Sequence, residues 1–146
     1  MQLKNITLLS KDEYTKYQSL IPNTDHWWWL KTQSSLSGAK DYVFVVDQVG
    51  ELRHCSGFYY GGVRPLCVFA FESTDPAFWY KPKKLVGSKI QYGQYNLTIL
   101  SAGKGEIHAL CDEAIARHYF DKNTSVWETS ELKRWLATEG FVKITV

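Results

Sequence analysis

The sequence predicts an α+β fold in which two short helices accompany a mostly antiparallel sheet within a single compact domain. The chain has 146 residues, the usual length of one domain with one hydrophobic core. Its apolar residues occur mainly in short runs bounded by glycine, proline, asparagine and aspartate, as expected for strands. Only two segments carry helix-start signals and no regular βαβ alternation is visible, which favours an antiparallel sheet.

The first half, residues 1–72, begins with a strand and a helix. Residues 3–9 alternate well enough for a strand. Ser10 and Glu13 have the spacing of a capping box, so we expect a helix over residues 11–20 that ends before Pro22. Further strands are expected at residues 26–32, 41–47, 51–55 and 63–71.

A connection at residues 73–87, which contains prolines and lysines, leads to the second half, residues 88–146. Strands are expected there at residues 89–92, 95–101, 106–111 and 141–146. Ser125 and Glu128 repeat the capping-box spacing and predict a second helix that ends at Gly140. The buried face of this helix is expected to comprise Leu132, Trp135 and Leu136.

Charge and cysteine content restrict the function classes. The 17 basic and 15 acidic residues give a net charge of +2, which does not favour a nucleic-acid partner. One short patch could still contact nucleic acid, and it consists of Trp79, Lys81, Lys83 and Lys84. Three cysteines indicate a reducing compartment, and no run approaches the about 18 apolar residues of a membrane span. We therefore expect a cytoplasmic protein with no membrane contact.

No sequence pattern requires a metal, a cofactor or catalysis. His54 and Cys55 are adjacent, so on a strand their side chains point to opposite faces. His108 and Cys111 lie three residues apart, but a structural zinc site needs a second such pair. Phosphate-binding and dinucleotide-binding motifs and the nucleophile elbow do not occur. One alternative remains: an enzyme that uses Cys55 or Cys111 with a distant histidine.

The segment DHWWWLKT at residues 25–32 places three tryptophans on one expected strand. Alternation sends Trp28 and Leu30 to one face and Trp27 and Trp29 to the other. We expect Trp28 and Leu30 to be the most deeply buried, and Trp27 to be partly exposed. Arg64 stands between apolar residues before a proline, so it needs a carboxylate or an aromatic ring. Trp29 is the ring we expect it to cover, with Asp41 and Asp47 as the candidate carboxylates.

The loop at residues 56–62 is the first candidate surface. Glycines flank Phe58, Tyr59 and Tyr60, so the three rings are either exposed or folded back onto the protein. Together with Arg53 and His54 on the preceding strand, they have the composition of interface hot spots. These five residues form the predicted partner-binding site.

Several ordered motifs carry a family resemblance. They are WWLKT at residues 28–32, YV at 42–43, DQVGEL at 47–52, GVRP at 62–65, IQYGQY at 90–95 and WETSELKRWL at 127–136. The set resembles an uncharacterised domain family of Firmicutes and their phages and mobile elements, with patterns W-W-L-R-S-P, G-V-R-P-A and W-x-x-S-x-L-R-x-W-L. Residues 31–33 (KTQ) replace R-S-P, and the two halves occur in the reverse order of longer, surface-exposed members. The residues that carry the resemblance include Trp28, Trp29, Arg64, Trp127 and Trp135.

The resemblance implies a compact recognition scaffold, and fold-level analogy links it distantly to C-type-lectin-like domains. We therefore expect a non-enzymatic protein-binding module of phage or mobile-element origin that recognises a protein partner through the aromatic loop. The alternative is a small phage accessory protein that inhibits a host defence complex, such as a CRISPR nuclease, as a stoichiometric blocker.

Overall fold

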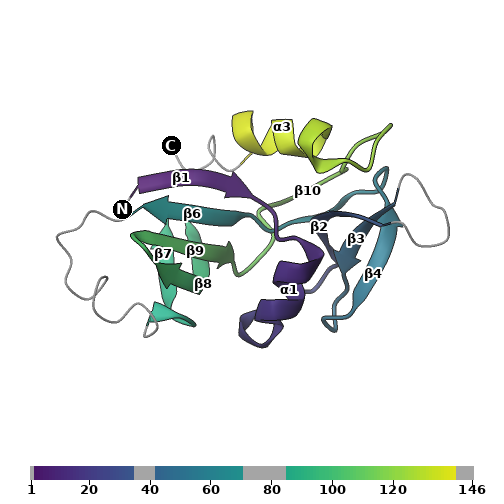
Figure 1. Ribbon diagram of the computed structural model, residues 1–146. Coiled ribbons are helices and arrows are strands. Elements are labelled where there is room, and N and C mark those ends of the chain that lie inside the picture. The colour runs from purple at the N-terminus through teal and green to yellow at the C-terminus, as the bar shows by residue number, and fades with distance from the viewer. Residues whose placement is uncertain (1, 35–41, 71–84, 141–146) are drawn as a thin grey trace.

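Two five-stranded sheets and two α-helices form the fold, in the computed structural model, which describes residues 2–34, 42–70 and 85–140. This is the α+β arrangement that the sequence predicts (Figure 1). In chain order the elements are β1 (Gln2–Thr7), α1 (Lys11–Tyr17), the 3₁₀ turn η1 (Gln18–Leu20), β2 (Trp28–Gln33), β3 (Tyr42–Val46), β4 (Leu52–Ser56), β5 (Gly61–Val63), β6 (Leu66–Ala70), β7 (Lys89–Tyr92), β8 (Tyr95–Gly103), β9 (Glu106–Cys111), β10 (Ala116–His118), the 3₁₀ turn η4 (Trp127–Thr129) and α3 (Glu131–Thr138).

Each sheet combines strands from both sides of the connection at residues 73–87. The strand order is β1-β6-β9-β8-β7 in the first sheet and β10-β5-β2-β3-β4 in the second. Among the described strands, all pairs are antiparallel except β2 with β5, which run parallel. Figure 1 shows α1 and α3 on opposite sides of the junction between the sheets. Because each sheet contains strands from both predicted halves, the two halves form one compact domain.

The first helix follows its sequence signal. The Ser10 hydroxyl accepts the amide of Glu13 at 3.1 Å, and the Glu13 carboxylate accepts the amide of Ser10 at 2.9 Å. The capping box is therefore confirmed. The α-helical part ends at Tyr17, and Gln18–Leu20 form the 3₁₀ turn η1, after which Ile21 is extended.

The start predicted for the second helix is wrong. Ser130 caps α3, because its hydroxyl accepts the amide of Lys133 at 3.1 Å. Ser125 is buried, and its hydroxyl accepts a hydrogen bond from the side chain of Gln33 at 2.7 Å. Glu128 lies in the 3₁₀ turn η4, which has no side-chain cap. The N-cap of the second helix is therefore Ser130, five residues after the predicted N-cap, Ser125.

The face of α3 and its end agree with the sequence. Leu132 and Leu136 are buried, and Trp135 is half-buried against the same core. The Gly140 amide closes the helix by donating to the Trp135 carbonyl at 2.7 Å. The strand expected at residues 141–146 lies outside the described residues.

The strand expected at residues 63–71 is also wrong, because the chain changes sheets in its middle. β5 ends at Val63 in the second sheet, and β6 begins at Leu66 in the first. Pro65 lies at this crossover, where its missing amide hydrogen breaks no ladder bond. Two glycines expected in the preceding loop belong to β5. A Cβ on Gly61 would lie 2.3 Å from the ring of Trp27, so this close packing requires glycine.

The tryptophan strand serves two apolar clusters, as its alternation predicts. Trp28 and Leu30 are buried in a cluster that includes Tyr14. Trp29 is buried in the larger cluster on the other face, and its indole nitrogen donates to the His118 carbonyl at 2.8 Å. Trp27 is only partly buried, as expected. The burial of Trp29 is greater than predicted, because its exposed fraction is 0%, as low as that of Leu30.

Arg64 is fully buried, but its partners differ from those predicted. Its guanidinium lies 4.5 Å from the ring centroid of Trp28, not over Trp29, which faces the opposite cluster. Asp41 lies outside the described residues, and Asp47 pairs with Arg53 instead. Three backbone carbonyls take the place of a carboxylate and accept hydrogen bonds at 2.9–3.1 Å. These belong to Cys111, Pro22 and Asp112.

Arg64 therefore ties three segments together: the crossover between the sheets, the end of β9 and the loop before β2. Burial lowers the pKa of Arg64 to about 10, partly opposed by the charge of Asp112. The guanidinium remains protonated at neutral pH and keeps its donors. Its charge is spread over carbonyl dipoles and the face of an indole.

We predict that Arg64→Met lowers the free energy of unfolding by about 3 kcal/mol, because three backbone carbonyls, that of Cys111 fully buried, lose their donor. Urea denaturation measures the change. Arg53→Met is the matched control, since the Arg53 side chain is 62% exposed and its ion pairs are at the surface. We expect the control to change stability by less than about 1 kcal/mol. Equal effects of the two substitutions would contradict the role of Arg64.

Candidate functional site

Three consecutive aromatic side chains project from the turn between β4 and β5. We call residues 57–60 the aromatic turn. Phe58 and Tyr59 are each 63% exposed, and Tyr60 is 62% exposed. Large aromatic side chains at this exposure leave apolar surface in water, which is unfavourable by roughly 25 cal/mol per Å². A cluster of such rings on adjacent residues is typical of a recognition surface.

The aromatic turn is held at its base by backbone hydrogen bonds. The Gly57 carbonyl accepts the amides of Phe120 at 2.8 Å and Asp121 at 3.2 Å. The Tyr59 amide donates to the Ser56 carbonyl at 3.3 Å, which closes the turn. Gly57 itself is buried, and a Cβ on it would lie 2.9 Å from the Asp121 carbonyl oxygen. The rings are thus exposed on a backbone that the rest of the fold anchors.

One of the three rings has aromatic neighbours that the sequence did not indicate. The Tyr60 ring centroid lies 5.8 Å from that of Tyr119 and 6.4 Å from that of His118. The His118 ring is stacked on Tyr119 at 4.5 Å and lies 4.8 Å from Trp135. Within the described part of the chain, Phe58 and Tyr59 make no ring contact. The signal for these neighbours was weak because β10 has only three residues, Ala116–His118.

The remaining two predicted binding residues lie on β4, the strand that leads into the aromatic turn. Arg53 pairs with Asp47 at 3.1 Å and with Glu51 at 3.0 Å, at the opposite end of the β3–β4 hairpin. Nδ1 of His54 lies 3.1 Å from the Ser34 hydroxyl. The structure thus brings together Phe58, Tyr59 and Tyr60, and separates Arg53 from them.

Four of the five residues named for the family resemblance are buried, and the fifth, Trp135, is half-buried. Trp28, Trp29 and Arg64 are fully buried, and Trp127 is 7% exposed. Trp135 is half-buried and packs against His118 beneath the aromatic turn. These residues therefore form the support of the candidate surface.

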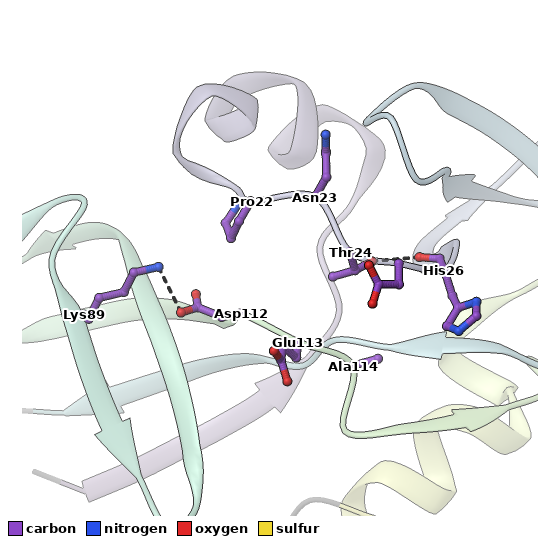
Figure 2. A pocket seen from close by; sticks show the side chains of 9 residues that line it. Pro22, Asn23, Thr24, His26, Lys89, Asp112, Glu113 and Ala114 are labelled. Carbon is purple, nitrogen blue, oxygen red and sulfur yellow. Dashed lines mark hydrogen bonds and ion pairs between the residues drawn. The ribbon is translucent and has the colours of Figure 1, made fainter.

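A cleft of about 490 Å³ lies at the junction of the two sheets (Figure 2). Its lining combines the loop before β2 with β7 and the segment after β9: Pro22, Asn23, Thr24, Asp25, His26, Lys89, Asp112, Glu113 and Ala114. Lys89 pairs with Asp112 at 2.9 Å, and the Thr98 hydroxyl donates to the other oxygen of Asp112 at 2.5 Å. Arg64 connects two of the lining segments, because it donates hydrogen bonds to the carbonyls of Pro22 and Asp112.

Two of the three cysteines, Cys67 and Cys55, lie in environments that disfavour the reactive thiolate. A hydrogen bond with Cys111, together with burial, raises the pKa of Cys67 far above its usual range. Burial raises the pKa of Cys55. Cys111 is fully buried. None of the three lines the cleft.

Over residues 2–34, 42–70 and 85–140, no group of three histidine, cysteine, aspartate or glutamate side chains is placed to hold a metal ion. In the same ranges, no helix is long and apolar enough to cross a bilayer. The possible nucleic-acid patch, Trp79, Lys81, Lys83 and Lys84, lies outside the described residues.

Comparisons with protein-family models, with curated proteins and with solved structures found no match to this chain. The family resemblance, and the phage or mobile-element origin that it implies, therefore stay predictions from sequence motifs.

We predict that Gly57→Ala lowers the free energy of unfolding by roughly 1–3 kcal/mol, because the new methyl group would press on the Asp121 carbonyl. Gly103→Ala is the matched control, since a Cβ there meets nothing within 4 Å. Urea denaturation of both variants measures the difference. If the two substitutions had the same effect, the close contact at the base of the aromatic turn would not exist.

Proposed function

We propose that the chain is a non-enzymatic binding module that recognises a protein partner through the aromatic turn. The observation that carries the proposal is the exposure of Phe58, Tyr59 and Tyr60, each above 60%, on three consecutive residues. Tyrosine and phenylalanine combine a large apolar surface with few rotatable bonds, and they are enriched at protein interfaces.

The anchoring of the turn supports this proposal. Hydrogen bonds from Phe120 and Asp121 fix Gly57, so the backbone is already ordered before a partner arrives. A preformed surface avoids the conformational entropy that a mobile loop loses on binding. Tyr60 is further oriented by its contact with Tyr119. Contacts of the three rings with a partner therefore contribute to affinity without an entropic cost for ordering the backbone of the turn.

The chemistry of the cysteines supports a non-enzymatic role. A nucleophilic cysteine needs a lowered pKa, whereas burial raises the pKa of Cys55, and a hydrogen bond with Cys111 together with burial raises the pKa of Cys67. His54, the histidine adjacent to Cys55 in sequence, contacts Ser34 instead. We also propose a cytoplasmic location, because all three cysteines are free and a reducing compartment keeps them so.

Co-purification from the source cells, followed by mass spectrometry, tests the proposal. We expect wild-type bait to retain a specific protein, and the double variant Phe58→Ala with Tyr59→Ala to recover at least tenfold less of it. Because both side chains are exposed, their loss should change stability by less than about 1 kcal/mol.

Val49→Ala is the matched control for this experiment. Val49 is 69% exposed in the β3–β4 turn, at the other end of the hairpin. We expect this variant to retain the partner at the wild-type level. Recovery of every specific partner by the folded double variant would exclude the aromatic turn as the binding surface.

A further inference from the structure

We propose that His118 is a positioning residue for the aromatic turn, because its ring holds the Tyr60 ring in one orientation in the free protein. This role rests on the function proposed above and names a residue on which the binding surface depends. His118 lies on β10, outside the aromatic turn, and it acts on a partner through Tyr60.

The His118 ring contacts three other aromatic rings. It is stacked on Tyr119, with ring centroids 4.5 Å apart and an interplanar angle of 30°, and it lies 4.8 Å from Trp135 of α3. The Tyr60 ring lies 6.4 Å from His118 and 5.8 Å from Tyr119. All four distances fall within the roughly 4.5–7 Å at which aromatic rings attract one another. His118 therefore connects Tyr60 to α3.

The backbone of His118 is fixed by contacts with two strands of its sheet. Its carbonyl accepts a hydrogen bond from the buried indole nitrogen of Trp29 on β2 at 2.8 Å. Its pairing partner on β5 is Gly61, the residue that directly follows Tyr60. The register between β10 and β5 therefore sets His118 beside the end of the aromatic turn.

A hydrogen bond also fixes the side chain of His118. Its Nδ1 atom lies 2.6 Å from the Tyr119 carbonyl oxygen. Because a carbonyl oxygen only accepts hydrogen bonds, Nδ1 is the ring nitrogen that carries the hydrogen. The ring thus has a defined place before a partner arrives.

The helix that carries Trp135 is attached to the segment after His118. The Leu132 amide donates to the Phe120 carbonyl at 3.0 Å, and the Glu131 amide donates to the Asp121 carboxylate at 2.9 Å. These hydrogen bonds keep the Trp135 ring against His118. The contact between His118 and Tyr60 is therefore supported from the core of the protein.

Tyr60 differs in this respect from the other two rings of the aromatic turn. All three rings are 62–63% exposed, but among the described residues only Tyr60 contacts other rings. We expect one χ1 rotamer to dominate for Tyr60, whereas Tyr59 averages over several. Tyr60 then loses less side-chain entropy on binding than Phe58 or Tyr59.

Three-bond NMR couplings between Hα and the two Hβ protons of Tyr60 test the proposal in the free protein. Limiting values indicate one χ1 rotamer, and intermediate values indicate averaging. We expect limiting values for Tyr60 in the wild type and intermediate values for Tyr59. His118→Asn keeps an N–H donor near the position of Nδ1 but removes the ring, and it should give intermediate values for Tyr60. His118→Phe keeps a ring without the donor, and it should retain the limiting values.

His26→Asn is the matched control, since His26 is exposed in the loop before β2 and makes no ring contact with the described residues. We expect it to leave the Tyr60 couplings unchanged. Urea denaturation establishes that each variant is folded. The partner identified by co-purification should bind His118→Asn about fivefold more weakly than the wild type, and His118→Phe like the wild type.

Intermediate couplings of Tyr60 in the wild type would overturn the role of His118 without any variant. Limiting couplings in folded His118→Asn, or equal binding of the partner to His118→Asn and the wild type, would also overturn it. If no partner were recovered, the proposed function would fail, while the couplings would still decide whether His118 orients Tyr60.

Discussion

The rest of the structure depends on the burial of one guanidinium at the point where the two sheets meet. Arg64 binds carbonyls from the loop before β2 and from the end of β9, and it lies against the ring of Trp28. A buried charge is unfavourable unless its donors are used, so these segments must stay where they are. Because Pro65 follows directly, the chain leaves one sheet and enters the other at this residue. The position of the cleft in Figure 2 is a consequence of the same contacts.

A series of contacts connects the strands at this junction to the aromatic turn. Gly61 leaves room for the rings of Trp27 and Trp29, and Trp29 in turn holds β10 through the His118 carbonyl. Phe120 and Asp121, which follow β10, then donate hydrogen bonds from their amides to the Gly57 carbonyl. Trp28 and Trp29 are therefore buried and Trp27 is partly buried, and their packing fixes the place from which other aromatic side chains face the solvent.

The sequence predicted correctly those features that depend on residues only a few positions apart. The capping box of α1 involves residues three apart and was predicted correctly, as were the two faces of the tryptophan strand. Ser125 was wrongly predicted as a helix cap, because its hydroxyl accepts a hydrogen bond from Gln33, a residue far away in the sequence. The split of residues 63–71 and the place of Arg64 depend on segments that meet only in the folded chain. For the candidate site, Phe58, Tyr59 and Tyr60 could be named from sequence, whereas the contribution of Tyr119 depends on a short strand pairing.

The central claim is that the exposed rings are carried by a backbone already fixed in the free protein. Amide hydrogen exchange of Phe120 and Asp121, observed by NMR in the absence of any partner, tests it most directly. These amides donate to Gly57, and the Cys111 amide, which donates to Pro65 in the core, is the internal standard. The account predicts that all three are protected and exchange only when a large part of the fold opens. Exchange of Phe120 and Asp121 at the rate of an unstructured peptide, with Cys111 still protected, would contradict it.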